Sequence, residues 1–186
     1  MLYIIYIGDN MKLYVISDIH GSYSDLEKFL DIIKDEEYDN LFILGDILHG
    51  YGYSHNTDVL QIGHLLSKVV TRLVLIKGNC DLPEDTKYLP TGFREAVHIM
   101  FKNRNLYFIH GHRYFPFGIL KENDILCHGH THINHITLDE EKKFIECCPG
   151  SIALPRANTE KTYMEINDSA IIIYNFQKEI IEKYEL

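Results

Sequence analysis

Side chains that commonly bind metals recur along this chain of 186 residues, each time at the end of a short apolar run. The clusters are Asp18-Ile19-His20, Gly45-Asp46, Gly78-Asn79-Cys80-Asp81, His110-Gly111-His112 and Gly129-His130-Thr131-His132. A short apolar run predicts a strand, and a strand end holds its side chains rigidly. Asp, His and Asn supply oxygen and imidazole donors, which suit Mn, Fe, Zn or Mg better than copper or an iron–sulfur cluster. A mixed set of this kind is typical of a two-metal hydrolase centre.

Each cluster taken alone has a purely structural alternative. Asp18 could cap the helix that follows it, Asp46 could cap a turn, and Gly78-Asn79 could be an ordinary turn. The pair His130 and His132 is more specific, because two histidines separated by one residue and entered through glycine rarely serve packing. Five independent accidents at five strand ends are hard to credit, so the clusters together favour a metal centre.

The composition indicates a soluble globular protein with a single domain over residues 1–186. Hydrophobic residues make up 46% of the chain and charged residues 24%, which excludes the disordered class. The net charge of -9 argues against a surface dedicated to long nucleic acids. A phosphate substrate remains compatible with this charge, because bound metal ions reverse the local field.

The cysteines and the N-terminus bear on location. Four cysteines without a disulfide-type spacing indicate reduced thiols in the cytoplasm. No apolar run approaches the roughly 18 residues of a membrane span, so no membrane partner is expected. Residues 1–10 are apolar and precede an alternative start at Met11. We interpret them as an N-terminal extension that adds an edge strand or a partner contact, without a catalytic role.

Hydrophobic periodicity divides the chain into two parts. The first part alternates predicted strands at 13–17, 41–44 and 73–76 with predicted helices at 25–34 and 59–70, a pattern that favours a parallel sheet covered by helices. The second part consists of short predicted strands at 95–101, 106–109, 125–127, 135–138, 143–147 and 152–154. Three further alternating segments, 163–166, 170–174 and 180–184, predict a terminal antiparallel meander. Two packed sheets in one domain fit both parts.

Read in order, Asp-x-His, Gly-Asp, Gly-Asn-x-Asp, His-Gly-His and Gly-His-Thr-His resemble the motifs of the calcineurin-like metallophosphoesterase superfamily. The short length, the Gly-Asn-Cys-Asp form and Pro149-Gly150-Ser151 resemble its small YfcE-type phosphodiesterase branch. The resemblance covers roughly residues 11–155. It implies an α/β fold, namely a four-layer α/β/β/α sandwich of two mixed β-sheets.

The resemblance also implies a ligand set for two divalent ions that share the carboxylate of Asp46. The remaining ligands would be Asp18, His20 and His132 for one ion, and Asn79, His110 and His130 for the other. Two ions about 3.5–4 Å apart polarise the phosphoryl oxygens and lower the pKa of a bridging water. Manganese is the first expectation for the metal, with Fe, Zn, Ni or Mg as alternatives.

The group that protonates the leaving group is less clear from the motifs. Larger members of the family carry His after the Asn, where this chain and the small branch carry Cys80. A neutral thiol is a poor proton donor, so we expect either a leaving group of low pKa or help from another histidine. His112 and His49 are the candidates, and Cys80 is expected to play a secondary role beside the metals. Tyr51, Tyr53 and His55 could line the substrate mouth or form a plain exposed loop.

The sequence therefore predicts a metal-dependent phosphodiesterase or phosphatase that hydrolyses a small phosphodiester or phosphomonoester by attack of a metal-bridging hydroxide. The alternative is a catalytically weak or inactive binding scaffold of the same fold, such as a retromer subunit that also lacks the leaving-group histidine. All seven expected ligands are present, which favours the enzyme. A nuclease is disfavoured by the acidic balance, and a homodimer would be unsurprising.

Overall fold

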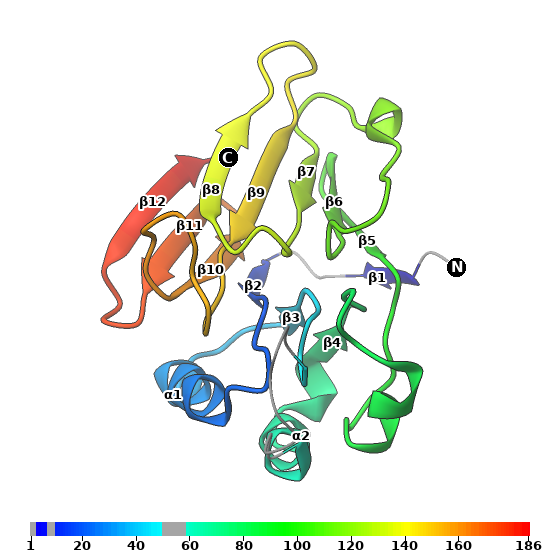
Figure 1. Cartoon of the computed structure of the whole chain (residues 1–186). Helices are drawn as coiled ribbons and strands as arrows, with labels where there is room; N and C mark the ends of the chain where they lie inside the picture. The colour runs from blue at the N-terminus through cyan, green and yellow to red at the C-terminus, as the bar shows by residue number, and fades with distance from the viewer. Residues whose placement is uncertain (1–2, 7–9, 50–58) are drawn as a thin grey trace.

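The computed structural model describes residues 3–6, 10–49 and 59–186. In these residues the strands form two six-stranded mixed sheets (Figure 1). Sheet A has the order β1-β5-β6-β7-β9-β8, and sheet B has the order β12-β11-β10-β2-β3-β4. The two-sheet architecture expected from the sequence is confirmed.

Sheet B contains the parallel strands of the first part of the chain and the antiparallel strands of the last part. The parallel strands are β2 (Lys12–Ile16), β3 (Asn40–Ile43) and β4 (Leu73–Leu75). The antiparallel strands are β10 (Thr162–Asn167), β11 (Ala170–Asn175) and β12 (Ile180–Glu185). Helices α1 (Tyr23–Ile33) and α2 (Val59–Ser67) connect the parallel strands and cover the outer face of this sheet (Figure 1).

Sheet A is built from the middle of the chain. Its strands are β1 (Tyr3–Tyr6), β5 (Val97–Phe101), β6 (Arg104–Phe108), β7 (Ile125–Cys127), β8 (Asn134–Leu138) and β9 (Ile145–Pro149). Strand β1 pairs in parallel with β5 at one edge, so the prediction of an edge strand at the N-terminus is confirmed. In the described ranges, three short 3-10 helices lie in connections: η1 (Val70–Arg72), η2 (Pro83–Lys87) and η3 (Phe117–Ile119).

Strand periodicity explains the position of the core. In β2, Leu13 and Val15 face sheet A, whereas Tyr14 and Ile16 face the helices, because successive side chains alternate across a strand. Phe42 of sheet B stacks on Phe108 of sheet A with ring centroids 4.1 Å apart. The inward faces of the two sheets thus form one apolar core. The ends of the strands lie beyond this core and can carry polar side chains.

Some predicted boundaries were wrong. Residues 152–154 are not a strand, because the N–H groups of Ala153 and Leu154 donate to Ser151 Oγ and not to a neighbouring strand. The second helix ends at Ser67, and a 3-10 turn follows it. On the outer face of sheet A, the segment around η3 packs against the sheet through Phe115 and Leu120. Among the described residues, the helices are all too short or too polar to cross a membrane.

Candidate metal centre

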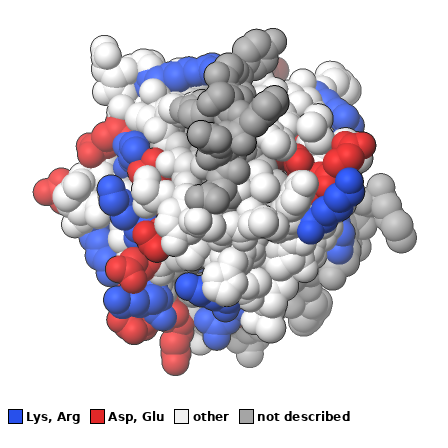
Figure 2. Space-filling view, turned by 60° about the horizontal axis from the view of Figure 1, so that its bottom comes forward, with Lys and Arg blue, Asp and Glu red and all other residues white. Residues whose placement is uncertain are grey.

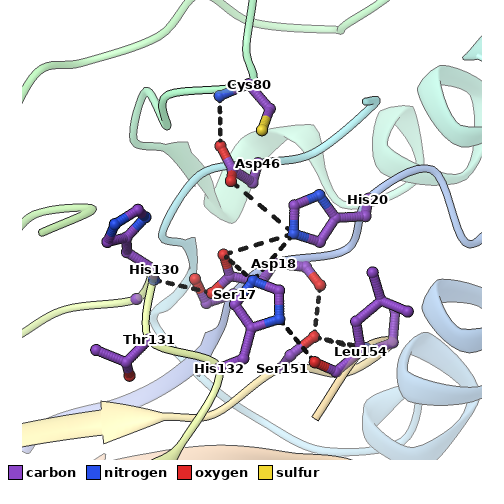
Figure 3. Close-up of polar contacts among 12 residues, drawn as sticks. Ser17, Asp18, His20, Asp46, Cys80, His130, Thr131, His132, Ser151 and Leu154 are labelled. Atoms are coloured by element: carbon purple, nitrogen blue, oxygen red, sulfur yellow. Dashed lines mark hydrogen bonds and ion pairs between the residues drawn. The ribbon is translucent and has the colours of Figure 1, made fainter. Parts of the chain in front are cut away.

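The ends of five chain segments meet at one edge of the sandwich. Backbone hydrogen bonds hold the loops after β2 and β3 together, from Asp18 N to Gly45 O at 3.2 Å and from His20 N to Asp46 O at 2.8 Å. The loop after β7 joins them, because the N–H of His130 donates to Asp18 Oδ2 at 3.0 Å (Figure 3). Parallel strands place their carboxyl ends at the same edge of a sheet, which is why motifs far apart in the sequence converge here.

Asp18, His20 and His132 form the first group, and all three are buried. The Nε2 atoms of His20 and His132 lie 3.1 Å apart, and His132 Nε2 lies 3.4 Å from Asp18 Oδ1. Among the described residues, none forms a hydrogen bond with that buried carboxylate oxygen. Ligands bound at about 2.0–2.2 Å around one tetrahedral ion stand about 3.3–3.6 Å apart, so these three atoms are close to the spacing that an ion requires.

Backbone carbonyls determine which ring nitrogen carries the proton in the neutral form of these histidines. His20 Nδ1 lies 2.8 Å from His49 O, and His132 Nδ1 lies 2.6 Å from Leu154 O. A carbonyl oxygen only accepts, so each Nδ1 carries a proton and each neutral ring presents a lone pair at Nε2. Two lone pairs then face each other beside a carboxylate. A cation between them would relieve this repulsion, and metal-binding histidines are commonly oriented in this way.

The second group contains Asp46, Asn79, His110 and His130. His110 Nδ1 donates to Leu44 O at 2.5 Å, so a neutral His110 ring presents its lone pair at Nε2. That Nε2 lies 3.0 Å from Asn79 Oδ1 and 3.5 Å from Asp46 Oδ1, and both oxygens are acceptors. The ring of His130 is 5.1 Å from that of His110 between centroids, and donor atoms of Asp46, His110 and His130 all lie within 4.8 Å of one another.

Asp46 lies between the two groups. Its Oδ2 is 3.9 Å from His20 Nε2 in the first group, and its Oδ1 is 3.5 Å from His110 Nε2 in the second. The backbone N–H of Cys80 donates to Oδ1 at 2.8 Å and fixes the carboxylate (Figure 3). One side chain therefore presents an oxygen to each group.

The charges in the first group are coupled. Burial raises the pKa of Asp18, but His132 and His110 lower it more, and the net shift is downward. Burial lowers the pKa of His132, whereas the Asp18 carboxylate raises it, and the net shift is upward. Asp18 is thus an ionised carboxylate at neutral pH, and it favours a positive charge at the Nε2 position of His132.

The backbone at this edge is unusual at five of the predicted ligands. Positive φ angles occur at Asp18 (55°), His20 (46°), Asp46 (52°), His130 (69°) and His132 (62°). A left-handed conformation costs a residue other than glycine roughly 1 kcal/mol or more. Such strain persists only where the surrounding structure enforces it, and it is found preferentially at functional sites. The short segments between ligands reverse direction here, which lets side chains two residues apart point to the same centre.

Asp81 is a positioning residue to which the sequence analysis assigned no role. Its buried carboxylate accepts N–H groups from Asp46 at 2.9 Å, Ile47 at 2.8 Å and Gly78 at 2.7 Å. It therefore ties the loop after β3 to the loop after β4. Burial raises the pKa of Asp81 in spite of these bonds. The signal in the sequence was its place in Gly78-Asn79-Cys80-Asp81, where an acidic residue follows an apolar strand.

Ser151 and two glycines also support the site. Ser151 Oγ donates to Asp18 O at 2.7 Å. A Cβ on Gly78 would meet Asp46 Oδ1 at 2.1 Å, and one on Gly129 would meet Ser17 Oγ at 2.0 Å. These glycines permit a close approach between loops that no larger residue allows. A single sequence could not reveal this, because the neighbours are distant along the chain.

The three candidates for a catalytic role beside the metals differ in environment. Burial and the Asp46 carboxylate raise the pKa of Cys80 to about 12, so its thiol is neutral. The ring of His112 lies 5.1 Å from that of His110, and burial together with His110 lowers the pKa of His112. His49 Nε2 lies 2.8 Å from Asp85 Oδ1. The carbonyl of His49 thus orients His20, while its ring is engaged by Asp85; Tyr51, Tyr53 and His55 lie outside the described residues.

A cavity of about 560 Å³ opens beside this edge. His110 and His112 border it on the side of the centre. The rest of its wall is largely apolar and aromatic, and includes Tyr107, Ile109, Tyr114, Phe115 and Pro116. The cavity therefore offers an apolar surface next to two of the clustered histidines.

Comparisons with known proteins address the family to which the chain belongs. The sequence profile of the calcineurin-like phosphoesterase superfamily domain matches residues 11–168. The phosphodiesterase YfcE of Escherichia coli K12 is 27% identical over 173 residues, which cover 88% of this chain and 91% of that protein. The solved structure of YfcE, described as a phosphoesterase from E. coli, superposes with a TM-score of 0.84 at 25% identity and covers 94% of this chain and 98% of its own.

A more distant structure shares the fold. Vps29 of Entamoeba histolytica in complex with Zn²⁺ has a TM-score of 0.61 at 23% identity, covering 94% of this chain and 99% of the other. The resemblance inferred from the motifs is confirmed by the profile, the relative and the YfcE structure. The chain belongs to the calcineurin-like phosphoesterase superfamily.

Proposed function

We propose that this protein is a phosphodiesterase that depends on two divalent metal ions. One ion is held by Asp18, His20 and His132, the other by Asn79, His110 and His130, and Asp46 bridges them. The observation that carries the proposal is the inward arrangement of acceptor atoms. The Nε2 atoms of His20 and His132 face each other at 3.1 Å, beside an oxygen of Asp18 that has no hydrogen-bond partner among the described residues.

The residues around the ions define the chemistry. When bound, two divalent ions supply a nucleophile at neutral pH and neutralise charge on a phosphoryl group. The backbone carbonyls behind the three histidines keep the Nε2 lone pairs directed at the ions, and the Cys80 N–H keeps Asp46 in the bridging orientation. The chain itself needs no nucleophilic side chain in this scheme.

The leaving group is the step with the least help from the protein. The Cys80 thiol is neutral but a weak acid, with a pKa near 12. His112 has a lowered pKa and is therefore mostly neutral at pH 7, so it is better suited to a hydrogen bond than to rapid proton donation. We therefore propose a diester with a leaving group of low pKa as the preferred substrate. An apolar or aromatic substituent would fit the cavity beside His112.

Manganese is the proposed metal, and zinc, iron, nickel or magnesium suit the same donors. A small substrate is supported by the surface charge. On the described part of the face shown in Figure 2, acidic and basic side chains lie intermixed, and the net charge is -9. Because the seven proposed ligands are arranged around one centre, an enzyme is favoured over an inactive scaffold.

The substitution Asp46→Asn tests the proposal. It removes the charge of the bridging side chain and keeps its size, so we expect the fold to survive while most bound metal and nearly all activity are lost. Metal content is measured by mass spectrometry after dialysis, and activity with chromogenic phosphodiesters and phosphomonoesters in the presence of Mn²⁺. Asp31→Asn is the matched control, because Asp31 is an exposed carboxylate on α1. Full metal occupancy in folded Asp46→Asn protein would refute the bridging role.

A further inference from the structure

A second cluster of metal-ligand side chains lies on the outer face of sheet A. It consists of His128, His135 and Glu146, and the donor atoms of these three residues all lie within 4.8 Å of one another. None of the three belongs to the ligand sets proposed above. The cluster is therefore a separate feature of the molecule that the phosphodiesterase chemistry does not explain.

Strand register explains why these side chains meet. Glu146 in β9 pairs with Leu126 in β7 on one side and with Thr137 in β8 on the other. Residues two apart on a strand share a face, so His128 lies on the face of Leu126, and His135 lies on the face of Thr137. The opposite face carries Cys127, Ile136 and Cys147, which are buried between the two sheets. The cluster thus points away from the core.

The hydrogen bonds of His128 leave one ring nitrogen available. His128 Nδ1 lies 2.9 Å from Gly129 O and donates to it, so the neutral form of the ring would carry its lone pair at Nε2. The residue is only 8% exposed, and its buried Nε2 has no hydrogen-bond partner within the part of the chain that the structure describes. This nitrogen stands 3.2 Å from Glu146 Oε1, close to the spacing of about 3.3 Å between two ligands of a tetrahedral ion. Two acceptors therefore face each other at a distance that suits a cation.

His135 completes the set. Its Nδ1 lies 3.3 Å from Ile133 O, which assigns the proton to Nδ1 and leaves Nε2 as the donor atom for a metal. The rings of His128 and His135 are 5.3 Å apart between centroids. His135 and Glu146 are partly exposed, so an ion can enter from solvent and a water can take the remaining position. Two histidines and one carboxylate with an open position are a common zinc ligand set.

We propose that His128, His135 and Glu146 bind a further transition-metal ion, with Zn²⁺ as the best match. Cu(I) prefers sulfur ligands and Ca²⁺ prefers oxygen ligands alone, so a set of two imidazoles and one carboxylate favours neither. The site is linked to the main centre through the backbone, because Gly129 O belongs to the peptide that leads into His130. An ion bound here would hold the segment between β7 and β8 against β9.

Anomalous diffraction locates the ion directly. Crystals of the full-length, metal-loaded protein are soaked with micromolar Zn²⁺, and data are collected on both sides of the zinc absorption edge. We expect an anomalous peak among the three side chains, separate from any signal at Asp46. This readout does not depend on how many ions the main centre holds or on whether the protein hydrolyses a diester.

Zinc stoichiometry provides the second measurement. The variants His135→Asn and Glu146→Gln are expected to bind one zinc fewer per chain than the wild type under the same dialysis. His64→Asn is the matched control, since His64 is an exposed histidine on α2, and it should bind as much zinc as the wild type. No peak at the cluster, or equal zinc content in the wild type and both variants, would overturn the proposal and leave an ordinary ion pair between His128 and Glu146.

Discussion

Replacing Gly78 with alanine should displace the Asp46 carboxylate. A Cβ at this position would stand 2.1 Å from Asp46 Oδ1 and 2.4 Å from the Asp46 backbone nitrogen. A carbon and an oxygen in contact need about 3.3 Å, so the oxygen must move by roughly 1 Å. Metal–ligand distances tolerate only about 0.2 Å. The displacement is several times larger than a bridging carboxylate can absorb.

The expected effects on function and stability can be estimated separately. A misplacement of about 1 Å costs on the order of 10²-fold in rate, so kcat/KM for an activated diester should fall by at least that factor. Overpacking in a close-packed region costs about 1–3 kcal/mol, which for a chain of this size lowers Tm by roughly 2–12 °C. Metal content after dialysis should fall as well. These three quantities are measured on the same purified protein.

Gly92→Ala and Gly118→Ala are the matched controls. They introduce the same methyl group, and no atom of the described residues lies within 4 Å of a Cβ built at either position. Both variants should keep wild-type metal content, Tm and kcat/KM. Folded Gly78→Ala protein with full metal content and wild-type turnover would show that the close approach to Asp46 does not hold the centre together.

Three other predictions concern the leaving group, the N-terminus and pH. Cys80→His should raise the hydrolysis of diesters with poor leaving groups by about 10²-fold, and unchanged rates would contradict the missing-acid explanation. Deletion of residues 1–10 should leave metal content and turnover intact, because β1 pairs with β5 at the edge of sheet A. Lower metal content in folded, truncated protein would assign this segment a supporting role. In metal-free protein, the raised pKa of His132 means that its pair with Asp18 stabilises the fold below about pH 6.5. That contribution to stability is lost as the pH rises from about 6.5 through the raised pKa of His132. The Tm of chelator-treated protein should therefore fall as the pH rises through this interval, and His132→Asn should reduce the fall.

The sequence indicated which residues gather at one edge of the sandwich better than it indicated the bounds of some strands around them. The proposed ligands can be recognised in the sequence because each follows an apolar strand. The topology of the sheets then brings these strand ends to one edge. The strand expected at 152–154 was wrong because the N–H of Ala153 donates to Ser151 Oγ and not to a neighbouring strand. Hydrophobic periodicity does not reveal such a local side-chain hydrogen bond.

Other features depend on contacts that are distant in the sequence. The role of Asp81 requires three N–H groups from two loops, and the cluster on sheet A requires the register of β7, β8 and β9. His135 in particular reads as an isolated polar residue until β8 is paired with β9. The positive φ angles at the proposed ligands could not be predicted either, because a single sequence does not reveal backbone bonds between loops such as those from Asp18 and His20 to Gly45 O and Asp46 O.

Each of the two proposed ligand groups draws residues from both sheets. His20 follows a strand of sheet B and His132 precedes a strand of sheet A, and they are 112 residues apart in the sequence. An ion that joins them acts as a cross-link. Closing a loop of this length with a covalent bond removes about 5 kcal/mol of chain entropy from the unfolded state, and a tightly bound ion acts in the same sense. Packing of the two sheets against each other and retention of the metal ions would then be coupled. A molecule whose sheets have begun to separate would release its ions and lose activity before either sheet unfolds.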